Sequence, residues 1–422
     1  MKEKEPDFFS DPGVIDDPRP YFDMMRSKSS IVEEPYHGSL MVTGYDAVIE
    51  VLWRADDTFS SAVSVVGPIP SLPFTPRGED ISEQIEKHRE ELPWGKHLVC
   101  FDGEKHTRFR AILAGILNPK RVKQNEEYLY GLADRLIDRI IDKGCCDIVT
   151  EFAHAATTYA ISDLMGIPEA DRGELLDLIG APPSQLEGDA AHKIGPDPLI
   201  FLKPRFEQYL RERKSNPGND LMTEIANASF PDGSAPSLDD LARLCCFLFG
   251  AGQDTTSRLI AMGIKILAED KALQQRLRQE PDGIPNFLEE VLRFDAPVKA
   301  IYRLARRHTT IAGIDVPAGT IVTVCLTAAS NDPAKFDIPQ EFNIDRPNVR
   351  EHLGFSKGKH TCLGAPLGRL ESRVAIERLL ARTADIGISE EHHGATASRH
   401  YRYEPTYSFR SLADLYVTFI AA

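Results

Sequence analysis

Gly354-Phe-Ser-Lys-Gly-Lys-His-Thr-Cys-Leu-Gly364 places a cysteine between glycines, directly before a long amphipathic stretch. Glycines at 358 and 364 allow a sharp turn or a close approach of the backbone to a flat molecule. The apolar spacing over residues 365–382 predicts a helix, and the amide groups at the start of a helix stabilise a thiolate. Because a single cysteine is most often a small buried hydrophobic side chain, this arrangement alone gives Cys362 no function.

The composition of the chain limits its class and its partners. It has 422 residues, 42% of them hydrophobic, and its acidic residues outnumber its basic residues by 64 to 49. The net charge of −15 disfavours binding to nucleic acid or to an anionic membrane. Residues 1–13 contain no signal-peptide core, and no apolar run of about 18 residues could span a bilayer. We therefore expect a cytoplasmic protein whose seven cysteines are reduced.

Hydrophobic spacing predicts a mainly α-helical protein with a minor β portion. Helices are expected at residues 20–27, 45–54, 108–117, 128–141, 148–165, 199–213, 238–269 and 365–382, and strands or hairpins at 39–43, 310–322 and 414–420. Residues 59–97 and 180–198 lack clear spacing and are expected to be loops that cover a binding site, the second of them as a lid. Nothing indicates internal repeats or a doubly wound sheet.

The cysteine loop matches the pattern F-x-x-G-x-x-x-C-x-G at Phe355, Gly358, Cys362 and Gly364, with a histidine at position 360. This pattern resembles the haem-binding loop of the cytochrome P-450 family. The resemblance implies a P-450 fold in which haem b lies between a long distal helix and the helix that follows the cysteine loop. It also implies that Cys362 is the axial ligand of the iron and that Phe355 shields the sulfur. In that family the thiolate donates electron density to the iron and favours cleavage of the O–O bond.

The predicted helix over residues 238–269, about 48 Å long, contains Phe249-Gly-Ala-Gly-Gln-Asp-Thr-Thr256. The small residues Ala251 and Gly252 leave space beside the helix, and the hydroxyl of Thr255 can divert a backbone hydrogen bond and open a groove. In isolation the segment also fits a buried helix with a close packing contact. Beside the cysteine loop it resembles the family's oxygen-binding groove, which implies that Thr255 binds the oxygen to be activated and that Asp254 relays protons.

Two other segments resemble the supports of the family's cysteine loop. Glu290 and Arg293 lie three residues apart on one predicted helix, a spacing that in isolation fits a solvent-exposed ion pair. The resemblance implies instead a buried pair that is locked by Arg346, from a segment that begins at Phe342. These residues are expected to be structural and not catalytic.

Haem carries two propionates, and arginine suits the recognition of planar carboxylates. His106 and Arg110 lie one helical turn apart, Arg303 precedes a predicted hairpin, and His360 lies two residues before the cysteine. Each of these residues alone fits an ordinary surface charge. Their joint placement in the family's order implies that all four bind the propionates.

The resemblance covers nearly the whole chain and implies a monooxygenase of the bacterial type, formed by a single domain over residues 1–422 without a fused reductase. Such an enzyme uses O2 and electrons from NAD(P)H, delivered by a separate ferredoxin or flavodoxin with its reductase. It hydroxylates, dealkylates or epoxidises a small, largely apolar substrate, for which Phe247, Ala251, Val298 and Ile301 are expected to form the pocket. Lys299 could bind a substrate carboxylate, but a lysine between apolar residues more often faces solvent or the haem edge.

Four basic residues are expected to form a docking patch for the electron donor on an otherwise acidic molecule, although scattered solvated charges are the alternative. They are Lys105, Arg108, Lys357 and Lys359. The residues 390–393 (Glu-Glu-His-His) lie in a turn-prone stretch and are not expected to bind a metal.

Two other functions stay open, namely a peroxygenase driven by H2O2 and a non-catalytic haem-binding sensor or carrier. Neither of them requires the acid and alcohol pair at 254 and 255. The presence of that pair favours the monooxygenase.

Overall fold

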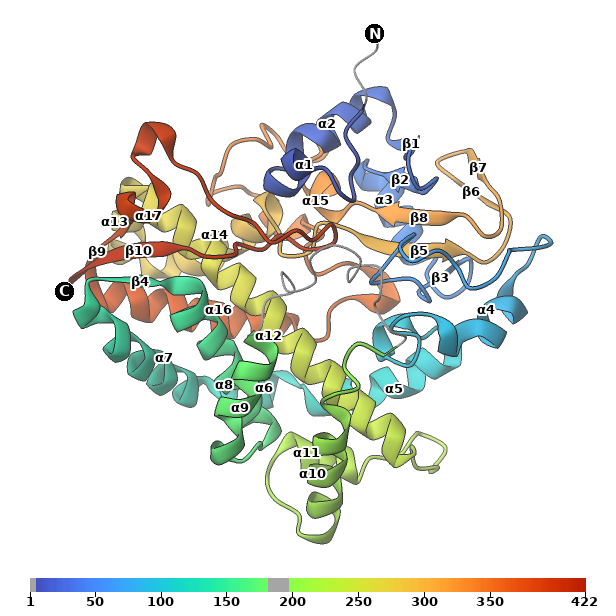
Figure 1. The fold of residues 1–422 in the computed structure, drawn as a ribbon, viewed down its shortest axis with the longest axis horizontal. Coiled ribbons are helices and arrows are strands. Elements are labelled where there is room, and N and C mark those ends of the chain that lie inside the picture. The colour runs from blue at the N-terminus through green and yellow to red at the C-terminus, as the bar shows by residue number, and fades with distance from the viewer. Residues whose placement is uncertain (1–4, 181–196) are drawn as a thin grey trace.

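The chain folds into a mainly α-helical structure with a small β portion, which confirms the predicted fold class (Figure 1). The computed structural model describes residues 5–180 and 197–422. Helix α12 (Leu238–Glu269) runs diagonally through the centre of the molecule, and its bounds match those predicted. The hydroxyl of Ser237 accepts a hydrogen bond from the amide of Asp240 and thereby caps the start of this helix.

Helices from distant parts of the chain pack along α12. They are α8 (Ala155–Met165), α10 (Lys203–Ser215), α11 (Leu221–Ala226), α13 (Lys271–Gln279), α14 (Ile284–Phe294) and α16 (Ala365–Arg382). Helix α7 (Glu126–Ile140) packs against both α8 and α16. The shared core contains the fully buried side chains of Ile264, Phe287 and Ile376, so burial of their apolar faces holds these helices together.

The main sheet has its strands in the order β1-β2-β8-β5-β3 and lies at the upper right of α12 in Figure 1. These strands are β1 (Ile31–Glu33), β2 (Leu40–Val42), β3 (Phe59–Ser60), β5 (Ile301–Ala305) and β8 (Ile321–Val324). Strands β2 and β8 are parallel, and the other pairs in this sheet are antiparallel. Strand β5 brings Arg303 to the centre of the molecule, where its side chain is buried.

Two smaller sheets complete the β portion. The predicted hairpin is formed by β6 (Thr309–Ile311) and β7 (Ile314–Val316). Strand β10 (Tyr416–Ala421) pairs with β4 (Cys145–Asp147) on one side and with β9 (Thr383–Ile388) on the other. The last strand thereby joins the region before α8 to the end of α16.

The other described α-helices lie outside this group. They are α1 (Pro12–Asp16), α2 (Arg19–Lys28), α3 (Tyr45–Trp53), α4 (Ser82–His88), α5 (Gly103–Ile116), α6 (Pro119–Gln124), α9 (Glu169–Gly180), α15 (Leu326–Ser330) and α17 (Glu390–His393). The helix expected over residues 148–165 begins with a wider π-helical segment, Val149–His154, before α8. No described helix has both the length and the apolar character that crossing a membrane requires.

Of the two segments that were expected to be loops, only the first is described throughout. Residues 59–97 contain β3 and α4, and Ala62, Val63 and Ile85 within them are buried in a core cluster. Their apolar residues are irregularly spaced because most of the segment is neither helix nor strand, so periodicity did not reveal this core. Most of the expected lid at 180–198 lies outside the described residues.

Candidate active site

An internal cavity lies between α12 and the loop that precedes α16. Its volume is about 260 Å³. Most of its lining is apolar and includes Leu98, Leu113, Leu117, Ile161, Phe247 and Leu363. The residues that line it also include two histidines, two arginines, three threonines and one cysteine, so polar groups are concentrated within an apolar enclosure.

Cys362 lies deep within the protein, yet its side chain is exposed because it faces the cavity. Its amide donates to the carbonyl of Phe355 at 2.9 Å, which closes the loop, and the ring of Phe355 also lines the cavity. Burial raises the pKa of the Cys362 thiol, whereas the backbone amides of Gly364 and Ala365 and the charge of Arg110 act in the opposite direction. The amides at the start of α16 and the nearby arginines thus oppose the effect of burial, although the net shift still favours the neutral thiol in the absence of a ligand.

The four residues predicted to bind the propionates converge on the cavity from two elements and the cysteine loop. His106 and Arg110 lie on α5, Arg303 lies on β5, and His360 belongs to the loop. The imidazole rings of His106 and His360 are stacked, with their centres 3.9 Å apart. Arg110 donates to the carbonyl of Thr361 at 2.5 Å, so it also joins α5 to the cysteine loop.

Arg303 is 1% exposed and has no described carboxylate within ion-pair distance. Its Nη1 donates to the hydroxyl of Ser64 at 2.9 Å and to the carbonyl of Tyr302 at 2.7 Å, but its buried Nε has no partner among the described residues. Burying a charged group without a counter-charge is costly. Asp102 and Asp56 attract its charge from a longer distance, so an anion that reached the unpaired Nε of Arg303 would be stabilised.

Helix α12 forms the opposite wall of the cavity through Ala251, Gly252, Thr255 and Thr256. The hydroxyl of Thr255 donates to the carbonyl of Ala251 at 3.0 Å, within a helix that continues without interruption. A Cβ on Gly252 would lie 3.2 Å from Ile161, so a side chain here would crowd α8. Asp254 does not line the cavity and instead forms an ion pair with Arg258 at 2.7 Å.

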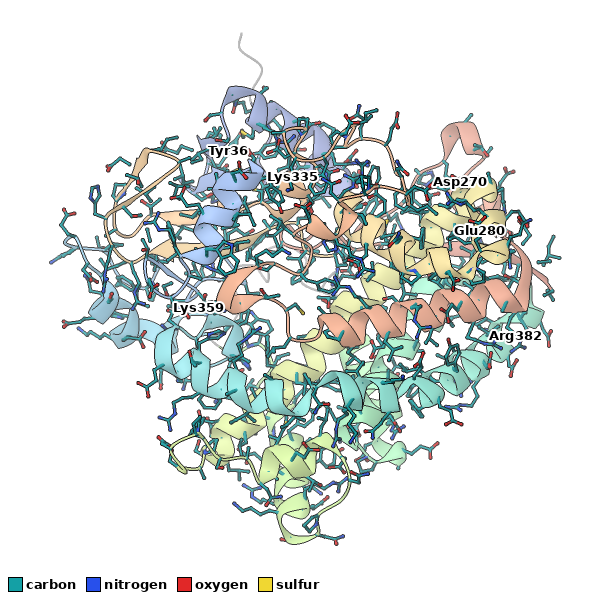
Figure 2. All side chains as sticks on the ribbon, turned by 180° about the vertical axis from the view of Figure 1, so that it is seen from behind. Tyr36, Asp270, Glu280, Lys335, Lys359 and Arg382 are labelled. Atoms are coloured by element: carbon teal, nitrogen blue, oxygen red, sulfur yellow. The ribbon has the colours of Figure 1, made fainter. Side chains whose placement is uncertain are left out.

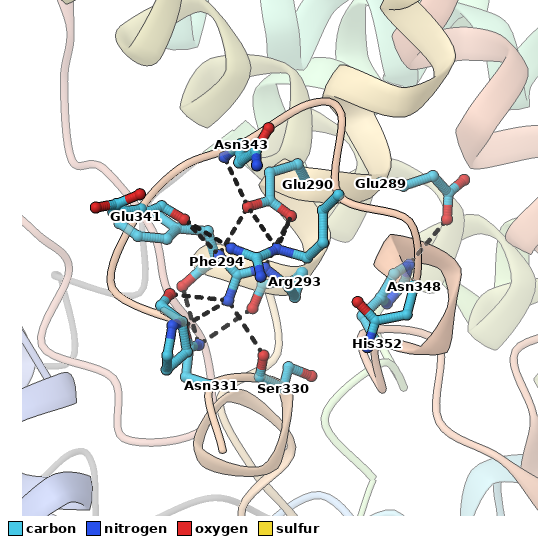
Figure 3. A network of polar contacts seen from close by, with 12 residues as sticks. Glu289, Glu290, Arg293, Phe294, Ser330, Asn331, Glu341, Asn343, Asn348 and His352 are labelled. Carbon is cyan, nitrogen blue, oxygen red and sulfur yellow. Dashed lines mark hydrogen bonds and ion pairs between the residues drawn. The ribbon is translucent and has the colours of Figure 1, made fainter. Parts of the chain in front are cut away.

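A buried polar network supports the cysteine loop (Figure 3). Glu290 and Arg293 are fully buried and form two hydrogen bonds of 2.8 Å. Arg346 approaches the same carboxylate at 3.3 Å, and Arg293 also donates to the side chain of Asn331 and to the carbonyl of Ser330. The triad inferred from the sequence is therefore present.

This network reaches the loop through direct contacts. The hydroxyl of Ser330 accepts a hydrogen bond from the amide of Leu353, one residue before the loop begins. Glu289, which precedes the triad's acid, accepts hydrogen bonds from His352 at 2.9 Å and from Arg369 of α16 at 2.5 and 3.0 Å. Helix α14 thus fixes both ends of the segment that carries the cysteine.

Comparison with known proteins gives the same assignment. A sequence model of the family described as Cytochrome P450 matches residues 191–383. Cytochrome P450 109 of Bacillus spizizenii is 35% identical over 297 residues, which cover 68% of this chain and 72% of that protein. The chain belongs to the cytochrome P450 family. Membership supports haem-thiolate monooxygenase activity with haem, O2 and electrons from a reductant.

Two solved structures show how closely this P450 follows known members. The substrate-free form of CYP150A6 from Mycobacterium marinum has a TM-score of 0.92 and 44% identity, with 99% of each chain covered. CYP109E1 from Bacillus megaterium in complex with testosterone has a TM-score of 0.79 and 25% identity, covering 95% of this chain and 99% of that one. The fold is therefore that of a bacterial P450.

The residues of this P450 fit a haem. An apolar enclosure contains one thiol that faces the cavity, and a buried arginine beside it lacks an anionic partner. A haem would place its two carboxylates among the two arginines and two histidines at the cavity edge and its iron near the thiol. The donor set therefore matches the prosthetic group that family membership implies.

Besides Asp254, two predicted site residues of this P450 are not among those that line the cavity. Val298 packs against the main sheet and bridges to Phe409, so it is not among the residues that line the cavity. Gly358 has a φ of 74°, and an added Cβ would lie 2.6 Å from the carbonyl oxygen of Leu52. This glycine is needed for the turn and for packing against α3, and not for contact with a flat molecule.

Lys299 points away from the cavity as well. Its Nζ donates to the carbonyl of Thr406 at 2.7 Å, and burial lowers its pKa to about 7. Lys299 therefore faces neither solvent nor a substrate carboxylate in the cavity. Ile301 at the start of β5 lines the cavity, whereas Lys299, which precedes the strand, lies beneath the C-terminal segment.

The charges of the expected docking patch are only partly free of partners within the protein. Lys359 is exposed on the loop before α16 and lies 3.8 Å from Asp57 (Figure 2). Arg108 binds Asp232 and Ser234, and the ammonium group of Lys105 lies over the ring of Phe101. Acids that are distant in sequence therefore neutralise part of the charge, and the nearby ring of Phe101 covers another part.

Sequence reasoning missed several polar groups that surround the site. Arg258 forms an ion pair with Asp254 and also contacts Glu404. Gln253 forms a hydrogen bond of 2.7 Å with His154. Asp56 contacts two of the predicted histidines. Asp56 and Asp57 are adjacent and equally polar in the sequence. Only the tertiary structure separates the buried acid from the exposed one.

Proposed function

We propose that this P450 hydroxylates, dealkylates or epoxidises a small, largely apolar organic substrate. We further propose that it is a single domain that receives electrons from a separate ferredoxin or flavodoxin and its reductase. The observation that carries the proposal is one cavity with the Cys362 thiol in one wall and Thr255 of α12 in the other. Haem, when bound there, supplies the activation of O2.

The residues on the cysteine side of the cavity have defined roles in this proposal. Cys362 provides the thiolate ligand, which is stabilised by the amides at the start of α16 and by Arg110. His106, Arg110, Arg303 and His360 bind the two propionates at the cavity edge. Glu290, Arg293 and Arg346 hold the loop rigid, so the sulfur keeps its position.

The residues on α12, opposite the cysteine, control the delivery of protons to the cavity. The single hydrogen of the Thr255 hydroxyl is donated to Ala251, which leaves the oxygen lone pairs free to accept a hydrogen bond from a protonated group in the cavity. Asp254, one residue earlier, is the group that exchanges protons with the outside. Its contact with Arg258 keeps the carboxylate on the side of α12 that leads away from the cavity.

The substrate class follows from the lining. Phe247, Leu248, Ala251 and Ile301 surround the cavity beside Thr255, and they exclude water from the reaction. The cations among the described lining residues are already assigned to the propionates. The testosterone complex of the related CYP109E1 supports an apolar substrate of this general kind.

The test is a difference spectrum of the reduced protein with carbon monoxide. We expect the strongly red-shifted Soret band of thiolate-ligated haem, and its loss in Cys362→Ala. A Cys362→Ala protein that kept the band would overturn the ligand assignment. Product formation that depends on NADH and ferredoxin, compared with product formation from H2O2 alone, then separates a monooxygenase from a peroxygenase or a haem carrier.

A further inference from the structure

A buried carboxylate joins the two stacked histidines at the cavity edge. Oδ1 of Asp56 lies 2.8 Å from Nε2 of His360, and Oδ2 lies 3.6 Å from Nδ1 of His106. The side chain of Asp56 is 1% exposed, and it does not itself line the cavity. The two histidines come from α5 and from the cysteine loop, so this acid connects elements that are about 250 residues apart in the chain.

The backbone is built to present this side chain inward. Asp56 has a φ of 73°, a left-handed conformation that side chains other than glycine adopt rarely. Its amide donates to the carbonyl of Phe59 at 2.9 Å, and its carbonyl accepts from Arg306 at 2.6 Å. Burial alone would raise the pKa of Asp56, but the contacts with His106 and His360 outweigh burial and lower it.

The three side chains could in principle hold a metal ion, since their ligand atoms lie within 4.8 Å of one another. The ring geometry argues against this function. The imidazole planes are inclined by only 19° and their centres are 3.9 Å apart. A zinc ion lies about 2.0–2.1 Å from each nitrogen, close to the plane of each ring, and it cannot lie in two parallel planes at once.

We propose that Asp56 is a positioning residue for haem, which acts through His106 and His360. The inference rests on the proposed function, because it requires a haem whose propionates reach the two imidazoles. One carboxylate that contacts both rings fixes their orientation and keeps them at the cavity edge. The arrangement is analogous to that of carboxylates that orient histidine ligands of metals from behind.

Asp56→Asn keeps the size of the side chain and removes its charge. We expect the rate of haem transfer from this variant to excess apomyoglobin to rise about tenfold or more, the typical cost of losing such a partner. Asp57→Asn is the matched control, because Asp57 is the adjacent residue but is 77% exposed. Its rate of haem loss should equal that of the unmodified protein.

A double-mutant cycle separates positioning from general structural damage. In a His106→Phe/His360→Phe background, Asp56→Asn should change the rate of haem loss by less than about twofold, because its partners are gone. Should Asp56→Asn fail to fold, Asp56→Glu displaces the carboxylate by one methylene and is tested in the same cycle, with faster haem loss expected only when both histidines are present.

Two results would overturn the inference. One is haem loss from the Asp56 variant at the rate of the Asp57 variant. The other is an undiminished effect of Asp56→Asn when both histidines are absent. The carbon monoxide spectrum of the unmodified protein is read separately. Its failure would remove the proposed function, whereas a normal spectrum with unchanged haem loss would remove only the role of Asp56.

Discussion

The guanidinium of Arg258 donates two hydrogen bonds to one carboxylate oxygen of Asp254, from Nε at 3.0 Å and from Nη2 at 2.7 Å. The same arginine contacts Glu404 of the C-terminal segment at 3.1 Å. Only 7% of its side chain is exposed, so its charge is shared between two acids in a poorly solvated place. The acid assigned to proton transfer is therefore held by a residue one turn further along its own helix.

Asp254→Asn should lower the rate of substrate turnover by about 100-fold, because a positioned general acid or base contributes at least that much. Haem content and substrate affinity should stay unchanged, since Asp254 does not line the cavity. The measurement is steady-state turnover in H2O and in D2O, with a larger solvent isotope effect expected in the variant. Glu269→Gln at the far end of α12 is the control, and equal rates for the two variants would contradict the assignment.

Thr255→Ala should reduce the yield of product per NAD(P)H consumed by about tenfold, the equivalent of one lost hydrogen bond. The missing electrons should appear as H2O2, because the hydroxyl no longer directs protons within the cavity. Parallel assays of NAD(P)H, H2O2 and product give the three quantities. Thr255→Ser, which keeps the hydroxyl, should restore most of the yield, and a serine variant as uncoupled as the alanine variant would argue against the hydroxyl.

Glu290→Gln should lower the free energy of unfolding by about 3–5 kcal/mol, because it leaves Arg293 as a buried and uncompensated charge. Urea denaturation of the holoprotein measures this change. Lys265→Met breaks the partly exposed i,i+4 pair with Glu269 and should cost no more than about 0.5 kcal/mol. Similar losses for the two variants would show that Glu290 and Arg293 do not act as a buried pair.

The ionisation of Glu289 should make the free energy of unfolding depend on pH. Burial favours its neutral form, but hydrogen bonds from His352 and Arg369 outweigh burial and lower its pKa to about 2. Because a glutamate in the unfolded chain titrates near pH ~4.3, the stabilisation is complete above that pH and is lost as the pH falls toward 2.

The deficit in unfolding free energy of Glu289→Gln should therefore be largest near pH 7 and smaller at pH 3. Urea midpoints at the two pH values provide the measurement. Glu280→Gln, at an exposed position after α13, should show no such change. A deficit of Glu289→Gln that is independent of pH would contradict the sign of the shift.

Lys357→Glu/Lys359→Glu should slow reduction by an acidic [2Fe–2S] ferredoxin by about tenfold at low ionic strength, because both residues belong to the loop that carries the cysteine. Stopped-flow reduction under carbon monoxide measures the rate. Lys87→Glu on α4 changes the net charge by two at a remote site and serves as the control. If the double variant is reduced at the unmodified rate, the donor docks elsewhere.

The sequence predicted the fold class and the main site residues because both depend on local order. The bounds of α12 and α16 follow from apolar spacing, a cap at Ser237 and glycine at 364, all of which are local signals. The positions of Cys362 and Thr255 in opposite walls of one cavity followed from the resemblance of two short motifs. The buried core within residues 59–97 could not be predicted from apolar spacing, because its buried residues do not recur at a regular interval.

Only the tertiary structure decided how polar side chains divide between the site and its surroundings. Asp56 and Asp57 are chemically identical neighbours, yet a left-handed backbone turns the first toward His360 and leaves the second in solvent. Val298 and Lys299 likewise lie outside the cavity because the C-terminal segment packs against them. Spacing along a chain determines helices and motifs, whereas burial and charge pairing depend on partners hundreds of residues away, and these partners exist only after folding.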